Sequence, residues 1–165
     1  MRKCIIPGSF DPVTAGHAAL IRTACDMFDE VCVMIVTNAE KSSAMFTSEE
    51  RLEILEAACK VIRADGASNL TCKVFQGLTT DAARSENARY IVRGVRSSAD
   101  FQYEYELSQI SRRLAPELIT VFIPSGAEYI HISSTYVREL IRYGLTDSQD
   151  LAAGTSEIIR RLYKS

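Results

Sequence analysis

The sequence predicts an α/β fold, a Rossmann-like doubly wound sheet of five parallel strands with helices on both faces. Short runs rich in apolar and β-branched residues alternate with longer runs whose apolar residues recur at helical spacing, which is the pattern of a parallel sheet with crossover helices. Residues 31–36 are nearly all apolar, as expected of a central strand covered on both faces. With 165 residues, the chain can bury one core, and we expect a single domain over residues 1–165.

The first half of the chain divides into strands and helices at clear local signals. A helix is expected over residues 15–28, because its apolar residues form one stripe. Thr47 and Glu50 have the spacing of a capping box, so a second helix should begin there. The strands expected in this half are residues 4–6, 31–36 and 70–75.

The second half continues the alternation of strands and helices. A proline ends the longest helix of this half and another stops the last strand. Strands are expected at residues 90–92 and 119–123, and helices at residues 79–85, 100–114, 134–143 and 156–163. Four apolar residues of the long helix share one face: Tyr103, Leu107, Ile110 and Leu114. Sheets of this kind bind ligands beyond the carboxyl ends of the strands, where the strand order reverses.

The composition excludes several classes of partner and site. Net charge is −2, so we expect no binding to nucleic acid or to a membrane surface through a general positive field. No apolar run approaches the length of a membrane helix. The five cysteines are odd in number and form no C-x-x-C pair, which favours reduced thiols in a cytoplasmic protein and no metal site.

The loop after the first strand contains the first candidate site. It reads Gly-Ser-Phe-Asp-Pro-Val-Thr-Ala-Gly-His over residues 8–17. Backbone N–H groups at a helix start favour phosphate, and glycine allows its close approach. His17 could donate a hydrogen bond to phosphoryl oxygens, although a Gly/Pro turn with a solvated histidine would produce some of the same pattern. The complete string resembles the nucleotidylyltransferase superfamily signature G-x-F-D-P-x-[TH]-x-G-H, in the T-x-G-H form of the phosphopantetheine adenylyltransferase family.

Two further motifs strengthen this resemblance. Residues 132–138 read Ile-Ser-Ser-Thr-Tyr-Val-Arg, where three hydroxyls can cap a helix or bind phosphate. They resemble the superfamily's second motif, I-S-[ST]-[ST]-x-x-R, with Arg138 at the arginine position. Arg93 and Arg96 flank a glycine after the fourth strand and suit phosphate recognition, although a solvated basic loop is the alternative. With residues 100–104 they resemble R-G-[LV]-R-x-x-x-D-F-x-Y-E, which is specific to the adenylyltransferase family.

Lys41 follows the second strand and would ordinarily be a surface residue. The family has a lysine in this loop, upstream of a phenylalanine and a capping box. Phe46 and Thr47 fill those places here, one residue further along than the family pattern. Resemblance covers roughly residues 3–143, and the tail over residues 144–165 lacks the family's last-turn features.

The resemblance implies the reaction of ATP with 4′-phosphopantetheine to give dephospho-coenzyme A and pyrophosphate, with Mg²⁺, in a homohexamer. It implies that His17 stabilises the transition state and that Lys41 and Arg96 take part in catalysis. Lys41 and Arg93 would bind the acceptor's phosphate, with Ser9 and Thr79 also on phosphopantetheine. The ATP site implied by the resemblance comprises Ser9, Phe10, Thr14, His17, Gly94, Val95, Arg96, Glu104, Tyr129, Ile130, His131, Ile132, Ser133, Ser134 and Thr135.

Two alternatives remain at this point. The first is a related nucleotidylyltransferase, such as one acting on nicotinamide mononucleotide, against which the Arg93 to Glu104 block argues. The second is a catalytically silent module that binds nucleotides for sensing, against which His17, Arg93 and Arg96 argue.

Overall fold

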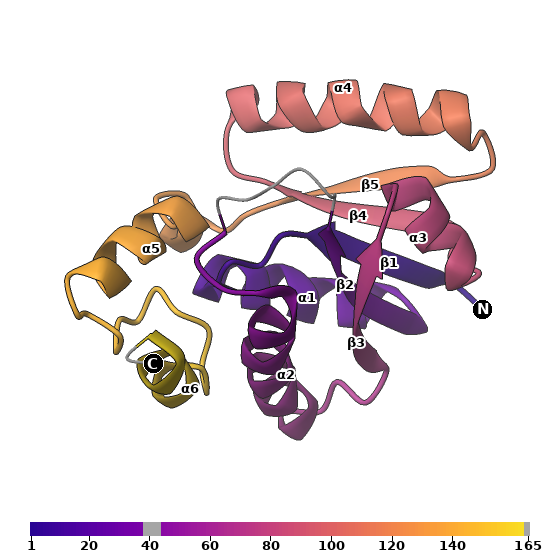
Figure 1. Ribbon diagram of the computed structural model, residues 1–165. Coiled ribbons are helices and arrows are strands. Elements are labelled where there is room, and N and C mark those ends of the chain that lie inside the picture. The colour runs from indigo at the N-terminus through magenta and orange to yellow at the C-terminus, as the bar shows by residue number, and fades with distance from the viewer. Residues whose placement is uncertain (38–43, 164–165) are drawn as a thin grey trace.

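The computed structural model describes residues 1–37 and 44–163 (Figure 1). Its strands form one parallel sheet in the order β3-β2-β1-β4-β5, which confirms the predicted fold class. Each expected strand is present, and β4 runs three residues further than predicted. The strands are β1 Lys3–Gly8, β2 Glu30–Thr37, β3 Leu70–Gln76, β4 Tyr90–Val95 and β5 Ile119–Pro124.

The helices begin within two residues of their predicted starts, and where an end was predicted it lies within one residue of the observed end. The capping box at the start of α2 is confirmed, since Thr47 Oγ1 accepts from the Glu50 N–H at 3.2 Å and Glu50 Oε2 accepts from the Thr47 N–H at 2.8 Å. A short 3₁₀ helix, η1 (Ala127–Tyr129), was not predicted. The α-helices are α1 Ala15–Met27, α2 Ser48–Ala64, α3 Thr79–Ser85, α4 Ser98–Leu114, α5 Ser134–Arg142 and α6 Ser156–Tyr163.

Each face of the sheet has its own buried core, because side chains alternate along a strand. Cys4 and Ile6 of β1 belong to a large apolar cluster with α1, α2 and α5. Ile5, between them, belongs to a smaller cluster with α3 on the opposite face. Figure 1 shows α1 and α2 on one side of the sheet and α3 and α4 on the other. Helices on both faces were predicted.

The apolar face of α4 does not pack into the core. None of its 17 residues is buried. Tyr103, Ile110 and Leu114 are 60%, 56% and 52% exposed, respectively. The helix touches β4 and β5, but the shared face expected from the sequence lies open. Periodicity identified this face without showing what covers it.

The order of strands reverses between β1 and β4. The chain moves from β1 outward through β2 to β3, then returns to place β4 on the other side of β1. The carboxyl ends of β1 and β4 therefore point into one opening, where ligands of doubly wound sheets bind. This is the position of the first and third sequence motifs.

The tail packs against the start of α1. The Ala15 N–H donates to the Asp150 carbonyl at 2.8 Å. Thr14 and Leu151 form an antiparallel bridge, and Leu151 is buried. The C-terminal helix α6 contacts α2, so the segment for which resemblance offered no pattern supports the helix that carries His17.

No helix within residues 1–37 and 44–163 is long and apolar enough to cross a membrane. All five cysteines are free thiols, of which Cys4, Cys32 and Cys59 are buried. Burial raises the pKa of the Cys4 thiol to about 12, which keeps it protonated and unreactive.

Candidate active site

An open cleft of about 860 Å³ lies at the carboxyl ends of β1 and β4. Tyr129 lines a second cavity of about 40 Å³ next to it. Val95, Ile130 and His131 line neither cavity, and Lys41 lies outside the described residues. The predicted site residues that the cleft brings together are Ser9, Phe10, Thr14, His17, Thr79, Arg93, Gly94, Arg96, Glu104, Ile132, Ser133, Ser134 and Thr135.

The loop after β1 has a constrained backbone. Phe10 has a φ of +45°, a left-handed conformation that is uncommon outside glycine. Gly8 is required nearby, since a Cβ atom there would stand 2.9 Å from the Phe10 ring. A loop that holds such a conformation needs support from its surroundings.

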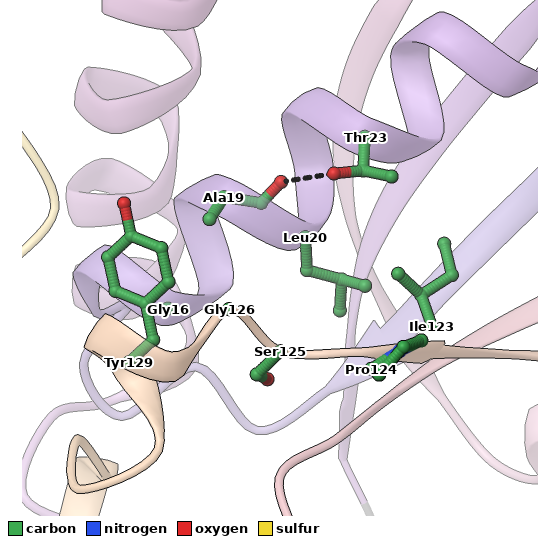
Figure 2. Close-up of a pocket in the computed structure, with 9 residues that line it drawn as sticks. All are labelled: Gly16, Ala19, Leu20, Thr23, Ile123, Pro124, Ser125, Gly126 and Tyr129. Atoms are coloured by element: carbon green, nitrogen blue, oxygen red, sulfur yellow. Dashed lines mark hydrogen bonds between the residues drawn. The ribbon is translucent and has the colours of Figure 1, made fainter.

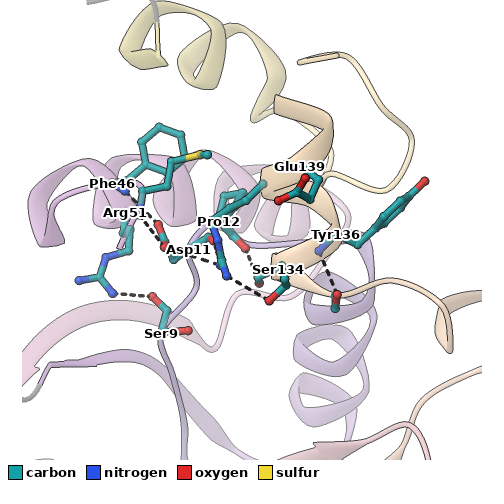
Figure 3. Close-up of polar contacts among 12 residues, drawn as sticks. Ser9, Asp11, Pro12, Phe46, Arg51, Ser134, Tyr136 and Glu139 are labelled. Atoms are coloured by element: carbon teal, nitrogen blue, oxygen red, sulfur yellow. Dashed lines mark hydrogen bonds and ion pairs between the residues drawn. The ribbon is translucent and has the colours of Figure 1, made fainter. Parts of the chain in front are cut away.

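Other elements hold three carbonyls of this loop (Figure 3). The Ser9 carbonyl accepts from Arg51 Nη1 of α2 at 2.9 Å. The Asp11 carbonyl accepts from Arg138 Nη1 of α5 at 2.7 Å, and the Pro12 carbonyl from Ser134 Oγ at 3.0 Å. The start of α5 therefore supports the first motif in addition to lining the cleft.

The Asp11 side chain ties the same loop to the segment before α2. Its carboxylate accepts from the backbone N–H groups of Met45 at 2.8 Å and Phe46 at 3.0 Å. Arg138 Nη1 lies 3.7 Å from Asp11 Oδ2 as an ion pair. Asp11 is only 4% exposed, and these partners are what a buried carboxylate requires.

His17 is part of the N-terminal cap of α1. The Thr14 N–H donates to His17 Nδ1 at 3.1 Å, and the His17 N–H donates to Thr14 Oγ1 at 3.3 Å. Because Nδ1 accepts, the proton of the neutral ring lies on Nε2. Burial and then the charge of Arg96 lower the pKa of His17 from 6.5 to about 4, so the ring is a neutral N–H donor near pH 7.

Arg93 and Arg96 leave β4 toward different partners. Arg93 Nε lies 3.4 Å from Glu104 Oε2, and its Nη1 donates to the Pro7 carbonyl at 3.4 Å. Arg96 pairs with Asp100 at 3.4 Å and donates from Nη1 to the Ile132 carbonyl at 2.9 Å. The two arginines thus connect the end of β4 with the other two motifs.

Glu104 is a partly buried acid facing Arg93. Its Oε2 atom accepts no hydrogen bond within the described part of the chain. Burial raises the pKa of the Glu104 carboxyl, and Arg93 opposes that rise. This oxygen can accept a hydrogen bond from a ligand hydroxyl or amine while it stays ion-paired with Arg93.

The hydroxyls of the second motif are engaged before any ligand binds. Ser133 Oγ caps α5 by accepting from the Tyr136 N–H at 3.1 Å. Thr135 Oγ1 accepts from Arg138 Nη2 at 3.0 Å. Capping and phosphate binding are compatible, since a hydroxyl that accepts one bond can still donate another.

The smaller cavity lies between α1 and the end of β5 with the segment that follows it (Figure 2). Gly16, Ala19, Leu20 and Thr23 form one wall. Ile123, Pro124, Ser125, Gly126 and Tyr129 form the other. A Cβ atom at Gly16 would stand 3.4 Å from Tyr129, so glycine allows this close approach.

Apolar side chains extend the large cleft away from the charged residues. Leu78 precedes α3, and the others come from the open face of α4. They are Leu78, Leu107, Ile110 and Leu114. A ligand with an anionic end and a long, weakly polar arm would match this arrangement.

Sequence reasoning missed Asp11 and Arg51 as site residues. Asp11 stood inside the first motif, but its partners are 34 and 35 positions away. Arg51 is one charged residue in an amphipathic helix and has no local signal. Within the described ranges, no group of three His, Cys, Asp or Glu residues could hold a metal ion.

Known proteins share both the fold and the sequence. A family model described as cytidylyltransferase-like matches residues 5–140. A bifunctional NMN adenylyltransferase/ADP ribose pyrophosphatase from Francisella tularensis aligns with a TM-score of 0.76 over 99% of this chain and 50% of that chain. At 17% identity, this likeness establishes the fold alone.

Two curated relatives carry the same name. The phosphopantetheine adenylyltransferase of Symbiobacterium thermophilum is 44% identical over 144 residues, which cover 87% of this chain and 85% of that protein. The one from Finegoldia magna is 37% identical over 161 residues, which cover 98% and 96%. Together with the motifs gathered in the cleft, these matches show that the chain belongs to the phosphopantetheine adenylyltransferase family.

Proposed function

We propose that this chain transfers an adenylyl group from ATP to 4′-phosphopantetheine, giving dephospho-coenzyme A and pyrophosphate. The observation that carries the proposal is the meeting of all three motifs in one cleft. His17 comes from the first turn of α1, Arg93 from β4, and Arg96 from the position directly after β4. Ser133 is the N-cap of α5. The name of the relatives supports the same reaction.

The chemistry requires positioning and charge stabilisation more than a strong base. An oxygen of the acceptor's phosphate attacks the α-phosphorus of ATP, and the bond to the pyrophosphate oxygen breaks. Phosphate is already ionised near neutral pH, since its second pKa is about 6. Holding the two reactants in line can therefore supply most of the rate enhancement.

His17 has the protonation state for one part of this task. With Nδ1 fixed by the Thr14 N–H, the Nε2–H can donate to the α-phosphate as negative charge grows there. A neutral donor needs no proton transfer during the reaction. Arg96, which also lines the cleft, would add positive charge on the ATP phosphates.

The nucleotide would occupy the side of the cleft nearer β5. Tyr129, Gly16 and Gly126 line the small cavity there and would hold the adenine end. The backbone around Ser9 and Phe10, together with Thr14, would enclose the α-phosphate. Ile130 and His131 line neither cavity, so their predicted ATP contacts would require movement on binding.

The acceptor would lie along α4. Arg93 and Ser9 would hold its phosphate, and Lys41 stays a predicted partner outside the described residues. Thr79 and the apolar residues Leu107 and Ile110 line the path by which a pantetheine arm would leave the site. This placement explains why an apolar helix face remains uncovered in the isolated chain.

Mg²⁺ would enter with ATP and not through a protein cage. The cleft carboxylates are already committed: Asp11 to Arg138, Asp100 to Arg96, and Glu104 to Arg93. Mg²⁺ typically keeps several waters and binds substrate phosphates. The residues present therefore fit a metal ion that the ATP phosphates carry, where it would offset their negative charge.

The predicted homohexamer and cytoplasmic location belong to the same proposal. Exposed large side chains on α4, including Phe101 and Tyr105 at 42% and 44% exposure, support association of copies. Free cysteines support a reducing compartment. Sedimentation at six times the 18.3 kDa chain mass would establish the hexamer, and a monomer would contradict it.

Pyrophosphate release from ATP tests the reaction directly. The purified chain is assayed with 4′-phosphopantetheine, nicotinamide mononucleotide and glycerol 3-phosphate as separate acceptors. We expect fast turnover with phosphopantetheine alone. Equal turnover with nicotinamide mononucleotide would reject this acceptor, and no turnover with any of them would favour a silent nucleotide-binding module.

A further inference from the structure

Arg51 is a buried cation at the cleft. It lies in the first turn of α2, lines the cleft and is 8% exposed. Its Nη1 donates to the Ser9 carbonyl at 2.9 Å, and its Nε to the Thr47 carbonyl at 3.4 Å. Both acceptors are uncharged, and no carboxylate among residues 1–37 and 44–163 forms an ion pair with it.

The other arginines around the cleft differ in this respect. Arg93 pairs with Glu104 at 3.4 Å, Arg96 with Asp100 at 3.4 Å, and Arg138 with Asp11 at 3.7 Å. A buried charge is costly unless an opposite charge and hydrogen bonds compensate it. The positive charge on Arg51 is therefore left for an anion that enters the cleft.

The two hydrogen bonds of Arg51 also orient it. They fix two of its five donors on backbone carbonyls, and no described residue accepts from Nη2. A planar guanidinium that is already held loses little freedom on binding an anion. Its position beside Ser9 brings this donor to the loop that leads into the helix carrying His17.

We propose that Arg51 is a binding residue for the phosphate of the acceptor, in addition to the arginine and lysine that resemblance assigns to it. The proposal rests on the proposed function for the identity of that acceptor. Arg51 borders the β2 side of the cleft with Thr37 and Ala44, whereas the cavity assigned to adenine lies by β5. Since β1 and β4 separate β2 from β5, Arg51 faces the acceptor and not the nucleoside.

The test compares ligands with and without the phosphate. Binding of 4′-phosphopantetheine, pantetheine and ATP is measured by titration calorimetry, with displacement for the weak ligand, on wild type and Arg51→Gln. Glutamine keeps an N–H donor for the Ser9 carbonyl and removes the charge. We expect phosphopantetheine affinity to fall about 10- to 100-fold, with pantetheine and ATP affinities changing less than about threefold.

Two further variants complete the design. Arg51→Lys keeps the charge and should retain more phosphopantetheine affinity than Arg51→Gln, which a purely structural role would not predict. Lys60→Gln removes an exposed charge from the same helix and serves as the matched control. If Arg51→Gln does not fold, Arg51→Lys is compared with wild type, and it should weaken phosphopantetheine binding more than pantetheine or ATP binding, because an ammonium lacks the planar fork of the guanidinium.

Three results would overturn the inference. Equal losses for phosphopantetheine and pantetheine would make Arg51 a structural support of the Ser9 loop. A larger loss for ATP would move it to the nucleotide phosphates. A wild-type chain that does not prefer phosphopantetheine over pantetheine would instead reject the proposed function itself.

Discussion

The loop between β1 and α1 and the helix α4 border the same cleft, but their surroundings hold them very differently. Side chains from α2 and α5 bind the Ser9, Asp11 and Pro12 carbonyls of the loop, and the tail bridges Thr14. In contrast, α4 has no buried residue. The comparison suggests that the reacting groups are held rigidly, while the wall along the acceptor is left for a ligand or a neighbouring copy to cover.

Removing the Asp11 carboxylate, which ties the loop after β1 to α5 and to the segment before α2, should have the largest effect on stability. Asp11→Ala removes the partner of Arg138 and of two backbone N–H groups. We expect the free energy of unfolding to fall by about 3–5 kcal/mol, because a buried charge and buried donors lose their partners. Chemical denaturation measures this. The control is Asp147→Ala, which breaks the ion pair between Arg160 and an aspartate that is 82% exposed, and it should cost less than about 1 kcal/mol. Similar losses of stability in the two variants would contradict the view that Asp11 anchors the loop.

Removing the His17 N–H donor, which stands in the first turn of α1, should lower the turnover rate. His17→Ala should lower kcat about 10²- to 10³-fold, or about 3–4 kcal/mol, as for other preorganised donors. ATP affinity should change little, because the interaction forms mainly in the transition state. Steady-state kinetics and calorimetry on the folded variant test this. A kcat within a few-fold of wild type would reduce His17 to a helix cap.

The same residue should make stability depend on pH. Folded His17 has a pKa of about 4 against an ordinary value of 6.5, so the unfolded chain binds a proton first as the pH falls. The free energy of unfolding should therefore decrease between pH 6.5 and pH 4, by up to about 3 kcal/mol, and stay flat above that window with respect to this group.

Denaturation of wild type and His17→Gln across this range isolates the effect, because the carboxylates contribute equally to both proteins. The difference between the two free energies of unfolding should change by up to about 3 kcal/mol as the pH falls from 6.5 to 4, because only wild type carries the titrating imidazole. A constant difference would mean that the imidazole titrates normally in the folded state.

On the β4 side, Arg93→Ala should weaken phosphopantetheine binding by about 2–3 kcal/mol, as expected for a hydrogen bond to a charged group. ATP binding should weaken less, since Arg96 remains. Calorimetry with each ligand shows which affinity falls more. A larger loss of ATP affinity would mean that Arg93 binds the ATP phosphates and Arg96 the acceptor.

The smallest effect on stability is expected on α4. Ile110→Ala should change the free energy of unfolding by less than about 0.5 kcal/mol, since the side chain is 56% exposed. The substitution should nevertheless raise the KM for phosphopantetheine, because it removes apolar surface from the wall of the cleft. Met27→Ala, at a 41% exposed site on α1, should change neither quantity. A large stability loss at Ile110 would show that α4 is held more firmly than its exposure indicates.

Local signals in the sequence were sufficient for most of the fold. The Thr47 and Glu50 capping box contains its own partners within one helical turn, so its geometry could be predicted from spacing. Strand and helix bounds followed from periodicity in the same way. The open face of α4 could not be predicted, because an apolar stripe does not specify what covers it.

The site residues also divide into those that a local motif identifies and those that depend on contacts between distant parts of the chain. His17, Arg93 and Arg96 were found because each stands in a motif, and the structure brings them into one cleft. Arg51 was not found, since the Ser9 carbonyl that it holds is 42 positions away and the pairing depends on the packing of α2. The neutral state of His17 also required the structure, because burial and Arg96 set its pKa.

The bridge between Thr14 and Leu151 has a consequence for biosynthesis. A ribosome adds about 5–20 residues per second, so Thr14 leaves the exit tunnel seconds before Leu151 is made. During that interval the nascent chain can assemble its strands, but the Ala15 amide has no Asp150 carbonyl to bind. A premature stop codon between residues 139 and 149 would therefore yield a product that carries every signature motif but lacks the segment that bonds to Thr14 and Ala15.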